Sequence, residues 1–230
     1  MCTRFLLLRN AKALAAELGL VGVPEVGPRY NAAPRQLLPI VRRRSAKAAE
    51  REAVLARWGF GSKLPSEGAA GRAPLINARA ETAAEKPTFR ESFRLRRCVV
   101  PADGFYEWER TGGGQQPWLF ESADKGELLL LAGLWTETAD TEFAVITTMP
   151  NTLVAPLHHR MPALIPTGSL DAWLDPATSL ARVADLLTPW PAEQMRARPV
   201  HPRLNKVTCD EPACLEPPPN VLRQLDLGLG

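Results

Sequence analysis

Short apolar runs separated by Gly- and Pro-rich segments cover most of the chain, and this rhythm restricts the fold more than any other feature of the sequence. Apolar runs of this length predict buried strands. They lie at residues 4–8, 36–43, 53–58, 98–100 continuing into 104–108, 117–121, 128–135 and 143–147. Strands outnumber helices and no β-α-β alternation occurs. We therefore expect an α+β fold, a single domain built around an antiparallel β-sheet or barrel with flanking short helices.

The expected helices and loops fill the intervals between these strands. Residues 10–18 predict a helix with Asn10 as N-cap and Gly19 as its stop. Further helices are expected at residues 78–85, 89–95, 170–174 and 179–187. Segments 20–35 and 59–75 carry several glycines and prolines and are expected to be loops, and the turn at 111–114 is expected to close a hairpin onto 117–121.

Length and composition are those of a globular protein in water. We expect one domain over residues 1–217 and an irregular tail over 218–230, because the Pro-rich end has little to bury. No run approaches the roughly 20 apolar residues of a membrane helix, and the apolar run at 5–8 is too short for a signal peptide. These features predict a cytoplasmic protein with no membrane partner, where four cysteines do not imply disulfides.

The net charge of +3 hides an asymmetry between the two halves of the chain. Residues 1–110 hold 20 Lys and Arg against 11 Asp and Glu, a balance of +9, whereas residues 111–230 hold 8 against 14, a balance of −6. A basic half suits a polyanion such as nucleic acid. An Arg-rich solvated surface is the alternative, and charge alone does not separate the two.

Cys2 is the residue whose position carries the most chemistry. Removal of Met1 would give Cys2 a free α-amine two bonds from its own sulfur. The amine has a pKa of about 7.7–8.0 and the thiol about 8.5, so both titrate near neutrality. The amine can condense with an aldehyde, and the thiol can then close onto the imine carbon as a thiazolidine ring. The alternative is a second residue that happens to be cysteine.

Four more segments hold residues suited to catalysis or binding. They are Arg29 to Pro34 in loop, Ile76 to Glu81 at a loop-to-helix junction, Asp103 to Trp108 in a strand, and Leu157 to Pro162. A carboxyl among aromatics has a raised pKa, which suits general acid–base work at Glu107, and histidine exchanges protons near neutral pH. The alternatives are an N-cap role for Asn77, an exposed strand position for Glu107, and surface or metal-binding histidines. The four-residue gap between Cys209 and Cys214, beside His201, argues against zinc, and we expect no metal and no cofactor.

Taken in order, these segments resemble the SRAP (SOS-response-associated peptidase) family, whose members shield abasic sites in single-stranded DNA by covalent attachment. The family pattern is matched by seven segments from Cys2 to about Pro202. They are Met1 to Phe5, Arg29 to Pro34, Trp58-Gly59, Ile76 to Glu81, Gly104 to Trp108 and His158 to Pro162, followed by His201-Pro202. The resemblance implies the SRAP fold for this chain.

The resemblance also implies a mechanism. Cys2 would form a thiazolidine with the ring-opened abasic deoxyribose, Glu107 would shuttle protons, and His158 would assist opening of the sugar. Asn77 would hold the sugar or Cys2 by hydrogen bonds. AP-lyase activity and autocatalytic removal of Met1 are implied side reactions.

DNA contacts follow from the same resemblance. Arg4, Arg79 and Arg160 would bind the phosphates that flank the lesion, since guanidinium groups match phosphate oxygens. Asn31 and Pro34 would line the same groove. The implied partner is single-stranded DNA with abasic sites, bound by a monomer that is nucleoid-associated when on DNA, with replication-fork proteins as further partners.

Three departures from the family pattern stand out. Thr3 replaces the usual Gly beside the nucleophile, and His159 stands where an Asp is common. The loop from Gly61 to Pro74 lacks the tryptophan usually found after Trp-Gly, a residue suited to stacking on DNA bases.

Two other classes of protein remain as alternatives. An N-terminal-nucleophile amidohydrolase of the glutaminase type also begins Met-Cys-Gly, but it needs a four-layer α/β/β/α fold. A non-covalent single-strand-binding module would need the basic groove and not the cysteine.

Overall fold

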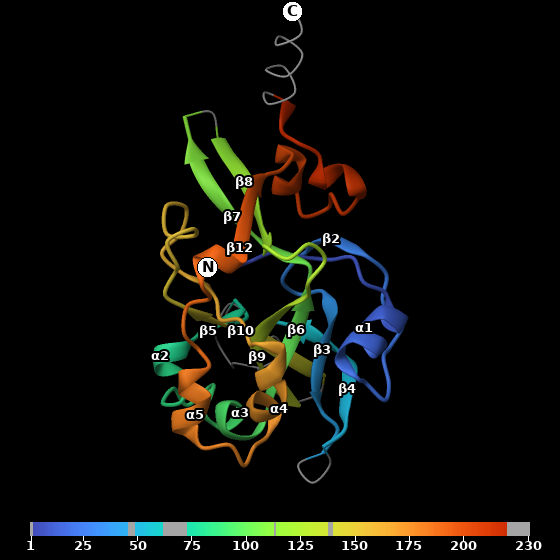
Figure 1. Cartoon of the computed structure of the whole chain (residues 1–230), viewed down its shortest axis with the longest axis vertical. Helices are drawn as coiled ribbons and strands as arrows, with labels where there is room; N and C mark the ends of the chain where they lie inside the picture. The colour runs from blue at the N-terminus through green and yellow to red at the C-terminus, as the bar shows by residue number, and fades with distance from the viewer. Residues whose placement is uncertain (1, 46–48, 62–72, 113, 138–139, 220–230) are drawn as a thin grey trace, which may run out of the picture.

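The fold is taken from a computed structural model, which describes residues 2–45, 49–61, 73–112, 114–137 and 140–219 (Figure 1). The strands are β1 (Phe5–Leu7), β2 (Arg29–Ala32), β3 (Leu37–Arg43), β4 (Arg51–Trp58), β5 (Asn77–Arg79), β6 (Arg97–Ala102), β7 (Gly104–Thr111), β8 (Gly114–Ser122), β9 (Leu129–Glu137), β10 (Thr141–Thr148), β11 (Met161–Pro162) and β12 (Met195–Pro199). The α-helices are α1 (Ala11–Leu18), α2 (Ala80–Ala83), α3 (Arg90–Leu95), α4 (Leu170–Leu174) and α5 (Leu180–Asp185), and four 3-10 turns are η1 (Thr167–Ser169), η2 (Ala192–Gln194), η3 (Pro202–Asn205) and η4 (Pro212–Leu215).

Five strands close into a barrel. The pairing runs β10-β4-β3-β6-β9, and β9 pairs again with β10, which completes the circuit. Strand β10 runs antiparallel to β9 and parallel to β4, so the barrel is mixed rather than purely antiparallel. Strands β5 and β11 also attach to β10, beyond the point where it leaves β4. Strand β10 therefore joins the barrel to the segments that hold Asn77 and Arg160.

A second sheet lies across the barrel in the order β12-β8-β7-β1-β2. The β7–β8 hairpin extends away from helices α3, α4 and α5, which gather at the opposite end of the molecule (Figure 1). Strand β1 pairs with β7, where Phe5 lies opposite Phe105. This pairing places the start of the chain beside the strand that carries Glu107.

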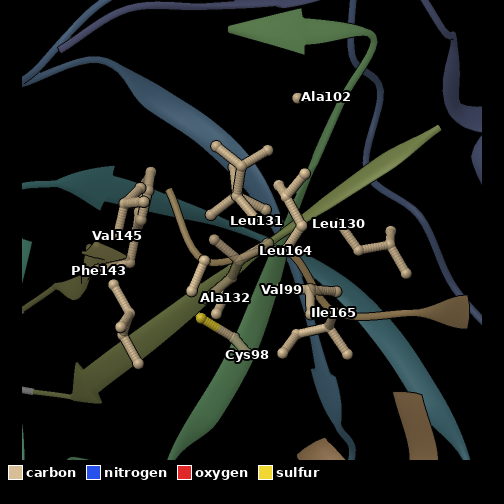
Figure 2. Packing of buried hydrophobic residues seen from close by; sticks show 14 of the residues in the cluster. Cys98, Val99, Ala102, Leu130, Leu131, Ala132, Phe143, Val145, Leu164 and Ile165 are labelled. Carbon is tan, nitrogen blue, oxygen red and sulfur yellow. The ribbon is translucent and has the colours of Figure 1, made fainter. Parts of the chain in front are cut away.

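The barrel interior is apolar and tightly filled (Figure 2). Side chains from β6, β9, β10 and the segment after β11 meet there, and each is almost fully buried. The labelled members are Cys98, Val99, Ala102, Leu130, Leu131, Ala132, Phe143, Val145, Leu164 and Ile165. At Gly133, opposite Cys98, an added Cβ would lie 2.9 Å from the cysteine Sγ, so close strand packing requires glycine there.

Trp58 connects the barrel to the strand that leads out from Cys2. Its ring is fully buried, tilted against Phe5 at 5.4 Å and stacked on Phe143 at 5.9 Å between centroids. The indole N–H donates to the carbonyl of Ile76 at 2.8 Å. Since Ile76 immediately precedes Asn77, one side chain fixes β1, β5 and β10 relative to one another.

Arg97 ties the helical end of the molecule to the barrel. Its buried guanidinium donates to the carbonyls of Phe93, Arg94, Trp173 and Asp175, at the C-terminal ends of α3 and α4. Burial lowers the pKa of this guanidinium to about 10. Carbonyls at helix C-termini otherwise lack hydrogen-bond partners, so the Arg97 guanidinium supplies donors to the C-terminal ends of both α3 and α4.

The expected α+β fold with a barrel and short helices is confirmed, and so are several element boundaries. Helix α1 has Asn10 as N-cap, accepting from the Ala13 amide at 3.0 Å, and Gly19 adopts φ 61° at its C-cap. The expected helices at 89–95, 170–174 and 179–187 correspond to α3, α4 and α5, and the 111–114 turn closes the β7–β8 hairpin.

Other expectations were wrong in specific places. Residues 29–32, expected in loop, form β2. Of the helix expected over 78–85, residues 78 and 79 belong to β5 instead, and α2 covers Ala80–Ala83. Strands β11 and β12 were not anticipated. The run from 98 to 108 is not one strand, because Asp103 separates β6 in the barrel from β7 in the second sheet. The Asp103 carboxylate accepts from the Leu8 amide and from Arg9, which fixes this joint.

The end of the described chain packs on the domain. Residues 212–215, within the expected domain, form η4, and Cys214 is fully buried against Leu6, Tyr106 and Leu204. Most of the expected tail, residues 220–230, and most of the loop that lacks the tryptophan, residues 62–72, lie outside the described residues. In the part that is described, no helix is long and apolar enough to cross a membrane.

The role of Trp58 yields a stability prediction. The substitution Trp58→Phe keeps an aromatic ring but leaves a void and removes the donor to the Ile76 carbonyl. We expect the free energy of unfolding to fall by about 2–4 kcal/mol in urea titration. Trp118→Phe is the matched control, because that indole donates to exposed Glu109, and its cost is expected below about 1 kcal/mol. Equal losses for the two variants would contradict a central role for Trp58.

Candidate active site

A groove of about 610 Å³ lies between the β7–β8 hairpin and the loop that follows β10. One wall is formed by hairpin residues and the other by residues 155–159. The lining residues are Glu107, Trp108, Glu109, Arg110, Gln115, Ala155, Pro156, Leu157, His158 and His159. Two of the four predicted catalytic residues, Glu107 and His158, therefore face one groove.

Cys2 is fully buried and does not line the groove itself, but its thiol interacts electrostatically with Glu107, which does. Its Sγ is 3.7 Å from the Arg4 carbonyl, and its own carbonyl accepts a hydrogen bond from Asn77 Nδ2 at 2.9 Å. Burial raises the pKa of the Cys2 thiol well above its ordinary value, and the negative charge of Glu107 adds to the rise. The structure therefore brings Cys2, Asn77 and Glu107 together and holds the thiol in its protonated form.

Two buried oxygens point to a polar guest at this site. Asn77 Oδ1 and Glu107 Oε1 are both buried without a hydrogen-bond partner among the described residues. An unpaired buried oxygen costs about 1–3 kcal/mol, so a guest that donates a hydrogen bond to either oxygen would recover that cost. Both oxygens can accept a hydrogen bond from an amine or a hydroxyl group.

Glu107 has the protonation behaviour of a general acid–base. It is 3% exposed, and burial raises its pKa to about 7. Both faces of β7 are covered at this point, since Phe105 packs in the main core on the same face as Glu107 and Tyr106 packs in a second cluster on the other face. At neutral pH the carboxyl is thus divided between its two forms, which lets it both give and take a proton.

His158 sits on the opposite wall, half-buried, with its ring stacked on exposed His159 at 4.4 Å between centroids. Its Nδ1 is 3.0 Å from both the amide and the carbonyl of Arg160. The neutral ring accepts from the amide, whereas the protonated ring donates to the carbonyl. Burial lowers the pKa of His158, so the neutral ring predominates near neutral pH.

Arg160 is placed differently from the sequence-based expectation of a phosphate ligand. Its guanidinium is 6% exposed and forms a bidentate pair with Glu81 at 2.7 and 2.9 Å. It also donates to the carbonyl of Thr147 on β10. The side chain therefore joins α2, β10 and the His158 loop, and it acts as a positioning residue.

Asn31 is also buried rather than groove-lining. Its amide nitrogen donates to the carbonyls of Leu204, Lys206 and Cys209, and its oxygen accepts from Arg4 Nη1 at 2.8 Å. Burial of Arg4 lowers the pKa of its guanidinium, which lies 5.6 Å from the Trp108 ring centroid. Asn31 thus sets the position of Arg4 and does not itself reach the groove.

The remaining predicted DNA contacts divide between two environments. Arg79 is exposed at the end of β5, two residues from Asn77. Pro34 is half-buried in the turn between β2 and β3 and is not among the residues that line the groove. Thr3, which replaces the family glycine, is half-buried beside Cys2.

Several residues of the site were missed by sequence reasoning. Glu81 stood inside a matched segment, but its pairing with Arg160 spans 79 positions and leaves no local pattern. Trp108 lines the groove, and its indole donates to Asn205 at 2.7 Å, another long-range contact. Glu109 was available from strand alternation, since it lies two residues beyond Glu107 on β7.

Comparison with known proteins identifies the class of this chain. Residues 1–207 match the family model described as SOS response associated peptidase (SRAP), and the chain belongs to that family. It is 31% identical over 227 residues to the abasic site processing protein YoqW of Bacillus subtilis (strain 168), covering 94% of this chain and 99% of that protein. It is 31% identical over 223 residues to the abasic site processing protein HMCES of Gallus gallus, covering 83% and 66%.

A solved structure has the same fold. The crystal structure of a protein from Bacteroides thetaiotaomicron superposes with a TM-score of 0.80 at 27% identity, over 94% of this chain and 99% of that one. The resemblance drawn from the sequence motifs and the expected α+β SRAP fold are both confirmed.

The Arg160–Glu81 pair yields a prediction on pH and stability. Glu81→Gln is expected to lower the free energy of unfolding by about 1 kcal/mol, since the half-exposed carboxylate is screened by solvent. The hydrogen bond from Arg160 lowers the pKa of Glu81 below 4.5. The difference in the free energy of unfolding between wild type and variant is therefore largest above pH 4.5, and it disappears as the pH falls through the lowered pKa of Glu81.

Thermal denaturation from pH 7 to pH 3 measures this difference. Glu85→Gln is the control, because Glu85 is exposed in the same segment, and it is expected to change stability little at any pH. A Glu81→Gln deficit that grows on acidification would contradict the assignment.

Proposed function

We propose that this protein binds single-stranded DNA at abasic sites and attaches to the open-chain deoxyribose through Cys2. The observation that supports this most is that Glu107 and His158 line one groove, while Cys2 interacts with Glu107 and is hydrogen-bonded to Asn77. The SRAP relatives named as abasic site processing proteins support the same class of substrate. Removal of Met1 must come first, because it creates the α-amine that reacts.

The proposed chemistry joins one amine, one thiol and one aldehyde. The Cys2 amine adds to C1′ of the sugar, and loss of water leaves an imine. The Sγ–H then adds across the C=N bond, so sulfur bonds to C1′ and the proton passes to nitrogen. The product is a thiazolidine, and the only leaving group is water. A thiol with a raised pKa is compatible with this order, because the amine attacks first.

The surrounding residues are assigned roles that suit their environments. Glu107 in its acid form protonates the departing hydroxyl, and its pKa of about 7 keeps that form available. His158, neutral near pH 7, takes a proton as the sugar ring opens. Asn77 holds the Cys2 carbonyl so that the amine faces the groove. Two side reactions fit the same groups: β-elimination from the imine, and attack on the Met1–Cys2 peptide bond assisted by Glu107.

DNA binding is assigned to the arginines and the aromatic side chain at the groove. Exposed Arg79 and half-buried Arg4 are proposed phosphate ligands, and groove-lining Arg110 joins them. Trp108 offers a ring on which a neighbouring base can stack. We assign Asn31 and Arg160 to positioning and Pro34 to the turn before β3. We further propose that the protein acts on DNA as a monomer in the cytoplasm, with replication-fork proteins as partners.

An adduct assay tests the covalent step. Wild-type protein mixed with an abasic single-stranded oligonucleotide is expected to give a band that survives denaturation and heating. Its mass should equal the chain without Met1 plus the DNA strand minus one water. Cys2→Ala should give no such band, whereas Cys98→Ala, which alters a barrel cysteine, should retain it.

Other outcomes identify the alternatives. Salt-sensitive binding with no adduct in any variant would indicate a non-covalent single-strand-binding module. Ammonia release from glutamine that depends on Cys2 would indicate an amidohydrolase, although the barrel observed here is not the four-layer fold of that class.

The pH dependence of adduct formation tests the role of Glu107. The acid form of Glu107 declines above about pH 7, and the free amine of Cys2 declines below about pH 8. We therefore expect a bell-shaped rate profile with its maximum between these values. Glu107→Gln should slow adduct formation about 10²-fold and remove the alkaline limb.

Glu109→Gln is the matched control, since it removes the same charge two residues along β7 at an exposed position. It should keep the alkaline limb. A Glu107→Gln profile that retains the limb would assign the proton transfer to another group.

A further inference from the structure

Two cysteines outside the groove lie in contact with each other. Cys209 Sγ and Cys214 Sγ are 3.2 Å apart, and both are free thiols. Cys209 is half-buried, whereas Cys214 is fully buried beneath it. A disulfide needs an S–S distance of about 2.05 Å, so a small movement of two side chains would be enough to form the bond.

These cysteines belong to a C-terminal strap, residues 201–215, which packs on β2 beside the groove. Asp210, next to Cys209, accepts from the amides of Tyr30 and Asn31 at 2.6 and 2.9 Å. The Cys209 carbonyl accepts from Asn31 Nδ2 at 2.8 Å. The strap therefore holds Asn31, which in turn holds Arg4.

We propose that Cys209 and Cys214 form an oxidisable dithiol whose disulfide closes residues 209–214 of this strap into a ring. The oxidant is a low-molecular-weight disulfide such as oxidised glutathione. The Cys209 thiolate attacks one of its sulfurs and displaces one glutathione thiolate. The Cys214 thiolate then attacks Cys209 Sγ and displaces the second. Two electrons and two protons leave the protein, and two reduced glutathione molecules form.

The order of attack follows from exposure. Cys209 is the reachable sulfur and reacts first, and buried Cys214 resolves the mixed disulfide from within the strap. Burial together with the adjacent Cys214 and Glu211 raises the pKa of Cys209 to about 11. Because the thiolate attacks, the rate should rise about tenfold per pH unit between pH 7 and pH 9.

This reaction is independent of the proposed DNA chemistry. Cys2 lies in another segment and is fully buried, and Cys98 lies in the barrel core. Oxidation of the strap therefore spares the proposed nucleophile. It should also raise the melting temperature, by about 5 °C for a short closed loop in a domain of this size.

Peptide mapping tests the proposal directly. Full-length protein is incubated with oxidised glutathione at pH 8, alkylated under denaturing conditions and digested with trypsin. Cys209 and Cys214 fall in one tryptic peptide, 207–223, whereas Cys98 falls in 98–110 and Cys2 in the N-terminal peptide ending at Arg4. We expect peptide 207–223 to be unalkylated and lighter by two hydrogens, with both other cysteines alkylated.

Two variants test the order of the steps. Cys214→Ser should stop at a glutathione adduct on Cys209, and Cys209→Ser should leave Cys214 unmodified. Both cysteines of peptide 207–223 alkylated in oxidised wild type, or a persistent glutathione adduct on wild-type Cys209, would overturn the proposal. The result does not depend on DNA, so a failed adduct assay leaves this test intact.

Discussion

The contacts of Trp58 are the constraint on which the arrangement of this molecule depends. The ring packs between Phe5 and Phe143, and its N–H reaches the Ile76 carbonyl. Strand β1, strand β10 and the residue that precedes β5 therefore all contact the Trp58 side chain. Without this side chain, no single contact would fix the strand that follows Cys2 relative to the strand that begins at Asn77. The hydrogen bond between Asn77 and Cys2 is thus a consequence of core packing rather than an independent feature.

Local sequence patterns predicted the elements whose causes are local. The Asn10 cap, the Gly19 stop and the hairpin at 111–114 each depend on residues within one turn, and each was correct. Residues 78 and 79 were misread as the start of a helix because their strand character comes from pairing with β10, where Ala78 lies opposite Ile146, 68 positions away. The catalytic candidates could be predicted because they lie in motifs that occur in a fixed order. The burial of Asn31 and Arg160 could not be predicted, because their partners Cys209 and Glu81 lie far along the chain.

In the proposed reaction, the electrostatics of the site give different roles to the amine and the thiol of Cys2. Burial disfavours the thiolate at Cys2 and keeps Glu107 partly protonated near pH 7. A site that relied on a thiolate would instead surround sulfur with cations or a helix N-terminus. Here burial has the largest effect on the thiol, and its polar neighbours include the Arg4 carbonyl and the Glu107 carboxyl group. This environment suits an amine that reacts first and a thiol that delivers its proton later.

The single-residue joint at Asp103 has a mechanical consequence. Strand β6 ends in the barrel at Ala102 and β7 begins at Gly104, with the Asp103 carboxylate bound to the Leu8 amide and to Arg9. A one-residue joint held by these hydrogen bonds leaves little freedom for the β7 wall of the groove to rotate against the barrel. Under the proposed DNA binding, the DNA rather than this wall would adapt. A flexible single strand would bend to fit, whereas a stiff duplex would have to be deformed at a cost of several kcal/mol.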